Sequence, residues 1–141
     1  MDLRIRFAAA LFLGGDYRKA APEFDALAAA VAKLEGPDSD EVLDYRRQAV
    51  VCRVALGEST RALTELESIS KAYERVGSDG REYLELRLSI ARLRLSDGQD
   101  RLAHQELREL SRDARDRLGD TDDLTVEIAA LLARLQTESD E

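Results

Sequence analysis

The stretch GGDYRKAAPEF, residues 14–24, places Ala20 five positions and Phe24 nine positions after its second glycine, Gly15. The same spacing of glycine, alanine and bulky apolar residue recurs after Gly57 and after Gly98, so the pattern repeats every 41 or 42 residues. A second glycine set has the same period: Gly36, Gly77 and Gly119. Two interleaved sets of glycines with one period indicate a repeat built from two elements.

The segments between these glycines have the pattern of amphipathic helices. Apolar side chains recur at every third or fourth position, which places them on one face of a helix. Asp38 with Glu41, and Asp79 with Glu82, have the spacing of capping boxes at helix starts. The sequence therefore predicts seven helices, over residues 2–13, 17–35, 40–56, 59–76, 80–96, 100–118 and 122–137.

The composition favours an all-α protein of one domain. The 141 residues are 44% hydrophobic and 35% charged, with two prolines, no tryptophan and 5% aromatic residues. A formal net charge of -8 disfavours binding to nucleic acid or to an anionic membrane surface. The single cysteine, Cys52, cannot form an internal disulfide, and together with the preference for arginine over lysine it predicts a bacterial, cytoplasmic protein.

These features resemble the tetratricopeptide repeat, in the long variant of about 42 residues seen in kinesin light chains. The resemblance is carried by the turn glycine with its alanine and bulky residue, and by the Arg-Val-Gly and Arg-Leu-Gly endings at 75–77 and 117–119. It implies a right-handed solenoid of helical hairpins, with repeats over about 1–36, 37–77 and 78–119. A capping helix over 120–137 and an acidic frayed tail over 138–141 complete the expected domain, 1–137 plus tail.

The stretches FDALAAAV, GPDSDEVLDYRRQA and ELRLSIARL also resemble the segment that follows the catalytic domain in some actinobacterial serine/threonine kinases. Both resemblances imply a non-catalytic module that binds a protein or peptide in a concave groove, here as a regulatory appendage of a kinase. The residues themselves do not predict an enzyme, a cofactor or a metal site. His104 is the only histidine, and it has no neighbouring nucleophile or metal-ligand set.

In this family the first helix of each hairpin lines the groove. Carried over by position, the groove residues are Arg6, Ala9, Asp44, Arg47, Gln48, Val51, Glu85, Ser89 and Arg92. Arg6, Arg47 and Arg92 could hold an acidic or phosphorylated segment through their forked donors. Alternatively this is a solvated face whose arginines pair with Asp44 and Glu85.

A second arginine set is expected to face the second helices of the hairpins: Arg46, Arg53, Arg87 and Arg94. Glu65, Glu106 and Glu109 are candidate partners for structural ion pairs, and binding of a partner protein is the alternative.

Both ends of the chain carry apolar helices. The first is apolar around much of its circumference, and Leu3, Ile5 and Phe12 predict that it packs on a second copy or on residues that precede it in a longer native chain. This gives a second hypothesis for function, a structural element for homodimers or for intramolecular bracing. In the last helix, one stripe is expected to close the final hairpin: Leu124, Ile128, Leu131 and Leu135.

Overall fold

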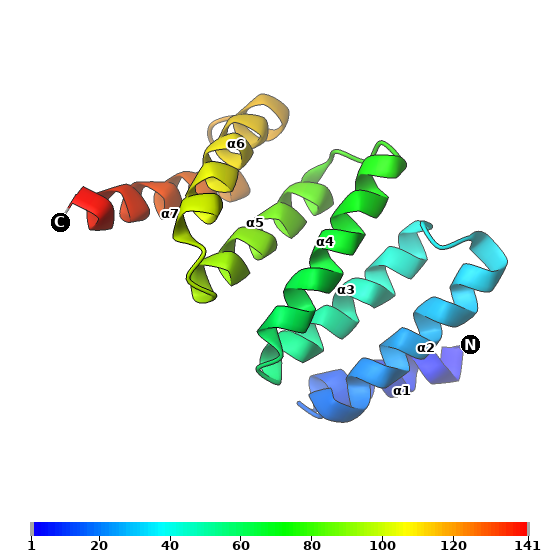
Figure 1. Ribbon diagram of the computed structural model, residues 1–141. Helices are drawn as coiled ribbons and strands as arrows, with labels where there is room; N and C mark the ends of the chain where they lie inside the picture. The colour runs from blue at the N-terminus through cyan, green and yellow to red at the C-terminus, as the bar shows by residue number, and fades with distance from the viewer. Residues whose placement is uncertain (1, 141) are drawn as a thin grey trace. The chain divides into compact units, whose positions relative to one another are not determined.

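The computed structural model describes the backbone of residues 2–140 and the side chains of residues 2–138. This part of the chain contains helices and turns (Figure 1). The helices are α1 (Asp2–Leu13), α2 (Tyr17–Glu35), α3 (Asp40–Ala55), α4 (Ser59–Arg75), α5 (Arg81–Ser96), α6 (Asp100–Leu118) and α7 (Asp123–Asp140). The seven predicted helices are confirmed, and their ends agree to within one residue except that α7 continues three residues further.

The repeated glycines lie in the turns that were predicted from their spacing. Gly57, after α3, has a φ of 82°, and Gly36, after α2, has a φ of 92°. This left-handed region is open to glycine but strained for residues with a Cβ. The other four members of the two sets have φ values in the same region. The period in the sequence is therefore a period of tight turns between helices.

The predicted capping boxes are wrong by one residue. The N-cap of α3 is Ser39, whose Oγ accepts a hydrogen bond from the Val42 amide at 3.2 Å. Asp38 instead accepts two hydrogen bonds from the Arg75 guanidinium. The N-cap of α5 is Gly80, which has no side chain, and the Asp79 carbonyl accepts a bond from Arg117. At each of these two turns an arginine near the end of the second helix therefore bonds a residue just before the first helix, through the Asp38 carboxylate in one hairpin and the Asp79 carbonyl in the other.

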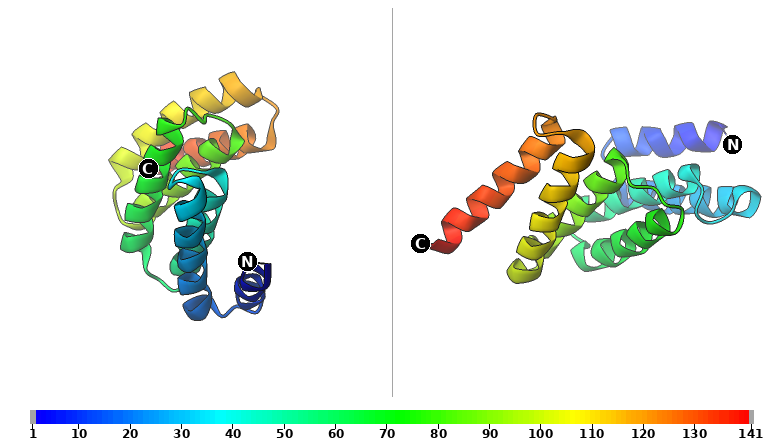
Figure 2. Two further views of the ribbon diagram at one scale, coloured as in Figure 1. Left: turned by 90° about the vertical axis from the view of Figure 1, so that its right-hand side faces the viewer. Right: turned by 90° about the horizontal axis from the view of Figure 1, so that it is seen from above.

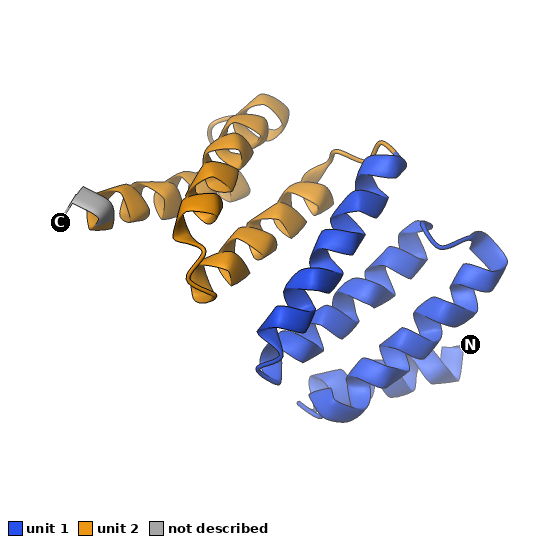
Figure 3. Cartoon of the chain, viewed as in Figure 1, with its two compact units in different colours: residues 1–76 blue, residues 77–141 orange. Residues whose placement is uncertain are grey.

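The chain divides into two compact units, residues 1–76 with α1 to α4 and residues 77–141 with α5 to α7 (Figure 3). Each unit has its own buried apolar cluster.

In the first unit, α2 packs between α1 and α3. Its buried residues Ala20, Phe24 and Leu27 meet Ala8 of α1 on one side. They meet Ala49 and Cys52 of α3 on the other side. The turn at residues 14–16 reverses the chain, so α1 and α2 are antiparallel (Figure 2).

In the second unit, α7 closes the last hairpin as its apolar stripe predicts. Leu124, Ile128 and Leu131 are buried against residues of α5 and α6, and Leu135 packs at the edge of the same cluster. This part of the prediction is confirmed.

Candidate protein-interaction surface

The arginines of α3 and α5 fall into two groups, and the first group points toward neighbouring helices. Arg53 is the most buried, since its side chain is only 5% exposed. Its guanidinium forms ion pairs with Asp25 of α2 and with Glu65 of α4, the latter at 3.0 Å. One α3 side chain therefore links three consecutive helices.

The pair with the following helix recurs 41 residues later. Arg94 of α5 pairs with Glu106 of α6 at 2.5 Å, and its side chain is 16% exposed. Arg87 pairs with Asp113 of α6 at 2.6 Å. Arg46 donates a hydrogen bond to the Ser68 Oγ at 2.9 Å. Of the three candidate partners, Glu65 and Glu106 pair with this arginine set, and Arg87 pairs with Asp113, which was not among the candidates.

The second group of polar residues in the first unit lies at the surface of α1 and α3. Arg6, Asp44 and Gln48 are exposed, and Arg47 is half-buried. Val51 is 48% exposed and has an apolar neighbour, Val54, at 41%. Val54 was missed from the sequence, although its spacing of three residues from Val51 places it near the same side of the helix.

In the second unit, the predicted groove residues of α5 have nearby partners. Ser89 Oγ donates to the Glu85 carbonyl of its own helix at 3.2 Å. Arg92 donates to Glu127 of α7 at 2.8 Å, in a pair whose two side chains are 47% and 52% exposed. Glu127 was also missed, because 35 residues separate it from Arg92 and no local pattern joins them.

The exposure of the Arg92–Glu127 pair determines what it can do. An ion pair in this setting contributes at most about 1 kcal/mol, because water competes for both charges. A phosphate or carboxylate can therefore displace Glu127 at small cost and accept bonds from the guanidinium. The pair of Arg53 is different, because its guanidinium is shielded from solvent.

The residues predicted for self-association separate into two sets. Ile5 and Phe12 are partly buried against the core of the first unit, and the centroid of the Phe12 ring lies 5.6 Å from the centroid of the Tyr17 ring. Leu3 is 80% exposed and Phe7 is 48% exposed. The large exposed apolar side chains of α1 are therefore Leu3, Phe7 and Leu13, the last at 84%, and they do not include Ile5 and Phe12.

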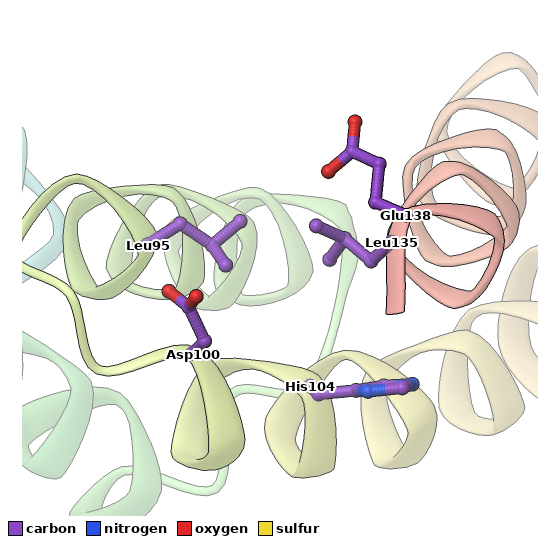
Figure 4. A pocket seen from close by; sticks show the side chains of 5 residues that line it. All are labelled: Leu95, Asp100, His104, Leu135 and Glu138. Atoms are coloured by element: carbon purple, nitrogen blue, oxygen red, sulfur yellow. The ribbon is translucent and has the colours of Figure 1, made fainter. Parts of the chain in front are cut away.

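His104 lies beside a hollow of about 260 Å³ in the second unit (Figure 4). Its other lining residues are Leu95, Asp100, Leu135 and Glu138. No group of three histidine, cysteine or acidic side chains among the described residues is arranged to hold a metal ion. Within the same part of the chain, no helix is both long enough and apolar enough to cross a membrane.

No family model and no curated protein matches this sequence. Two crystal structures of a putative kinesin light chain from Podosopora anserina, with nearly identical TPR-like repeats, match the fold with a TM-score of 0.78. The sequence identity is 18%, and the match covers 95% of this chain. The chain has the tetratricopeptide-like repeat fold. It spans 64% of the length of that neighbour.

Proposed function

We propose that the chain is a non-catalytic module that binds a protein or peptide on the outward faces of α3 and α5. These faces are defined by the predicted groove residues of each helix: Asp44, Arg47, Gln48 and Val51 on α3, and Glu85, Ser89 and Arg92 on α5. The observation that carries the proposal is the division of the arginines on these helices. Arg53, Arg87 and Arg94 are mostly shielded from solvent in their ion pairs, whereas Arg92 forms a solvent-exposed pair with Glu127. The outward set also includes exposed Gln48 and Val51, a mixture suited to an extended peptide.

The expected ligand is an acidic or phosphorylated segment. Arg6, Arg47 and Arg92 supply guanidinium donors that can bind a carboxylate or phosphate through two bonds. Val51 and Val54 supply exposed apolar surface on α3, the helix that carries Arg47.

A double charge reversal tests this proposal. Proteins captured from cell extract on the wild-type chain are identified, and the purified partner is then titrated against Arg47→Glu with Arg92→Glu. Binding should fall at least tenfold, about 1.4 kcal/mol, because both attractive charges become repulsive. The matched control is Arg101→Glu with Arg108→Glu, which makes the same change of charge at two exposed positions of α6. Unaltered binding by the folded Arg47→Glu, Arg92→Glu variant would contradict the proposal. So would an equal loss of binding affinity in the control variant.

The cellular context that we propose is the bacterial cytoplasm, with the module as a regulatory appendage of a serine/threonine kinase. This rests on the sequence resemblance and on the single, buried cysteine. The domain content of the native polypeptide tests it directly: a kinase domain in the same chain supports this context, and an unrelated domain contradicts it.

A second candidate function is structural, as a homodimer or bracing element. The exposure of Leu3 and Phe7 on α1 favours it, because large apolar side chains at one surface commonly mark a contact. Sedimentation over a range of protein concentrations tests this candidate, which predicts a dimer that Leu3→Ser with Phe7→Ser dissociates. A strict monomer would rule out homodimerisation.

A further inference from the structure

The outer face of α1, formed by Leu3, Phe7 and Ala10, is apolar and uncovered. Leu3 is 80% exposed, Phe7 is 48% exposed, and Ala10 is also exposed. Steps of four and three residues put these side chains in one stripe along the helix. The opposite side of α1 already packs on α2 through Ile5, Ala8 and Phe12.

The repeat register indicates what kind of element fits this face. The first two repeats are offset by 42 residues, so the outer-face positions correspond to Tyr45, Ala49 and Cys52 of α3. Those three residues are among those through which α3 packs on α2, the second helix of the preceding hairpin. Ala49 and Cys52 are 1% and 0% exposed there. The outer face of α1 therefore corresponds to the face of α3 that packs on the second helix of the preceding hairpin.

Charge at the edges of the stripe indicates the chemistry of that neighbour. Arg4 and Arg6 are both exposed. At 100° per residue, they lie on opposite sides of the line through Leu3 and Phe7. An apolar stripe with arginine along both edges is complementary to a helix that carries Asp or Glu beside its own apolar residues.

A second copy of the chain is a poorer fit to this charge pattern. If two α1 helices meet face to face about a two-fold axis, the arginines of one copy lie along the same edges as the arginines of the other. This holds for parallel and for antiparallel helices. Like charges placed together at an interface disfavour association.

We propose that the outer face of α1 binds an amphipathic helix of another protein, one whose apolar stripe is flanked by acidic residues. The contact would reproduce the packing of α2 on α3. The two proposals share Arg6, but Leu3 and Phe7 belong only to this face and Arg47 and Arg92 only to the other, so variants at those residues test the two proposals separately.

Two synthetic helical peptides test the proposal with the full chain. Both carry the same leucine and alanine stripe over about four turns and a side-chain staple on the opposite side, which offsets the weak helicity of short peptides. One has glutamate along both edges of the stripe and the other has lysine. Fluorescence anisotropy should show the glutamate peptide binding at least tenfold more tightly than the lysine peptide.

Three double variants distinguish this contact from non-specific hydrophobic binding. Leu3→Ser with Phe7→Ser should abolish binding of the glutamate peptide, and Arg4→Glu with Arg6→Glu should reverse the preference between the peptides. The control is Leu102→Ser with Val126→Ser, which removes two exposed apolar side chains of the second unit and should leave binding unchanged. All of these side chains are at the surface, so circular dichroism should show an unaltered fold.

Equal binding of the two peptides, or no saturable binding of the glutamate peptide, would overturn the proposal. So would a dimer of the wild-type chain that Leu3→Ser with Phe7→Ser dissociates, because a second copy would then cover this face.

Discussion

Arg53 shows how a buried charge is accommodated in this small fold. Its guanidinium is almost fully shielded, while its partners Asp25 and Glu65 are 46% and 28% exposed. The two sides of the pair should therefore respond differently to mutation. A carboxylate that loses the arginine can still be hydrated, but the arginine cannot recover solvent if it loses both carboxylates.

We expect Asp25→Ala with Glu65→Ala to lower the free energy of unfolding by about 3 kcal/mol, because it leaves a buried charge uncompensated. Arg53→Met should cost about 1 kcal/mol or less, since methionine fills much of the same space without a charge. Urea unfolding followed by circular dichroism measures both. If Arg53→Met lowered the free energy of unfolding as much as the loss of both acids does, an uncompensated buried charge would not explain the destabilisation.

The acids at the hairpin ends predict the response to low pH. The hydrogen bonds from Arg75 hold the pKa of Asp38 below its usual value, and the Leu124 amide, with Arg81, does the same for the pKa of Asp122. A lowered pKa in the folded state means that these acids stabilise the fold above about pH 4. That contribution is lost as the pH falls below the ordinary pKa and through the lowered one.

We expect Asp38→Asn with Asp122→Asn to flatten the dependence of the melting temperature on pH below about pH 4, because neither asparagine titrates. Thermal melts across the acid range test this. The exposed pair Asp116→Asn with Asp120→Asn is the matched control. If the melting temperature of the first variant fell with pH as steeply as that of the wild type, other carboxylates would cause the loss of stability.

Only part of this residue-level detail could be predicted from the sequence. Glu65 and Glu106 were recognised as candidate partners because they belong to the second helices that these arginines were expected to face. Asp25 and Glu127 were missed because each belongs to a helix of a neighbouring repeat, where only packing sets the register. Asp38 was mistaken for a cap because Ser39, one position later, competes for the same role.

At the scale of elements, the helices follow from two periods: 41 or 42 residues between turn glycines, and three or four between apolar residues. Glycine fixes the turns because φ there is positive, as at Gly36 and Gly57. The end of α7 was less predictable. No glycine follows Leu135, so the sequence contains no turn that would stop the helix there.

The role of α7 as a closing helix gives a test at this scale. Ile128 is 0% exposed and Leu131 is 6% exposed, so Ile128→Asp with Leu131→Asp buries two unpaired carboxylates in the core of the second unit. The free energy of unfolding should fall by about 4 kcal/mol or more. Ala129→Asp with Ala133→Asp, on the exposed side of the same helix, should cost much less. Equal thermal shifts for the two variants would show that α7 does not depend on this stripe.

At the scale of the whole molecule, the sequence predicts the architecture but not the partner. A repeat fold needs only a recurring pattern, and the period supplies that pattern over nearly the whole chain. The ligand depends on which side chains remain available at the surface. The fold is about equally stable whether an exposed charge such as Arg92 is paired or solvated. The repeat pattern in the sequence therefore does not indicate which exposed charges bind a ligand.

Amide hydrogen exchange with and without the purified partner would show whether this repeat fold binds protein on the outward faces of its first helices. We expect slower exchange on partner binding in α3 around Asp44 to Val51 and in α5 around Glu85 to Arg92, with α4 and α6 little changed. Slower exchange confined to α4 and α6, with α3 and α5 unaffected, would contradict it.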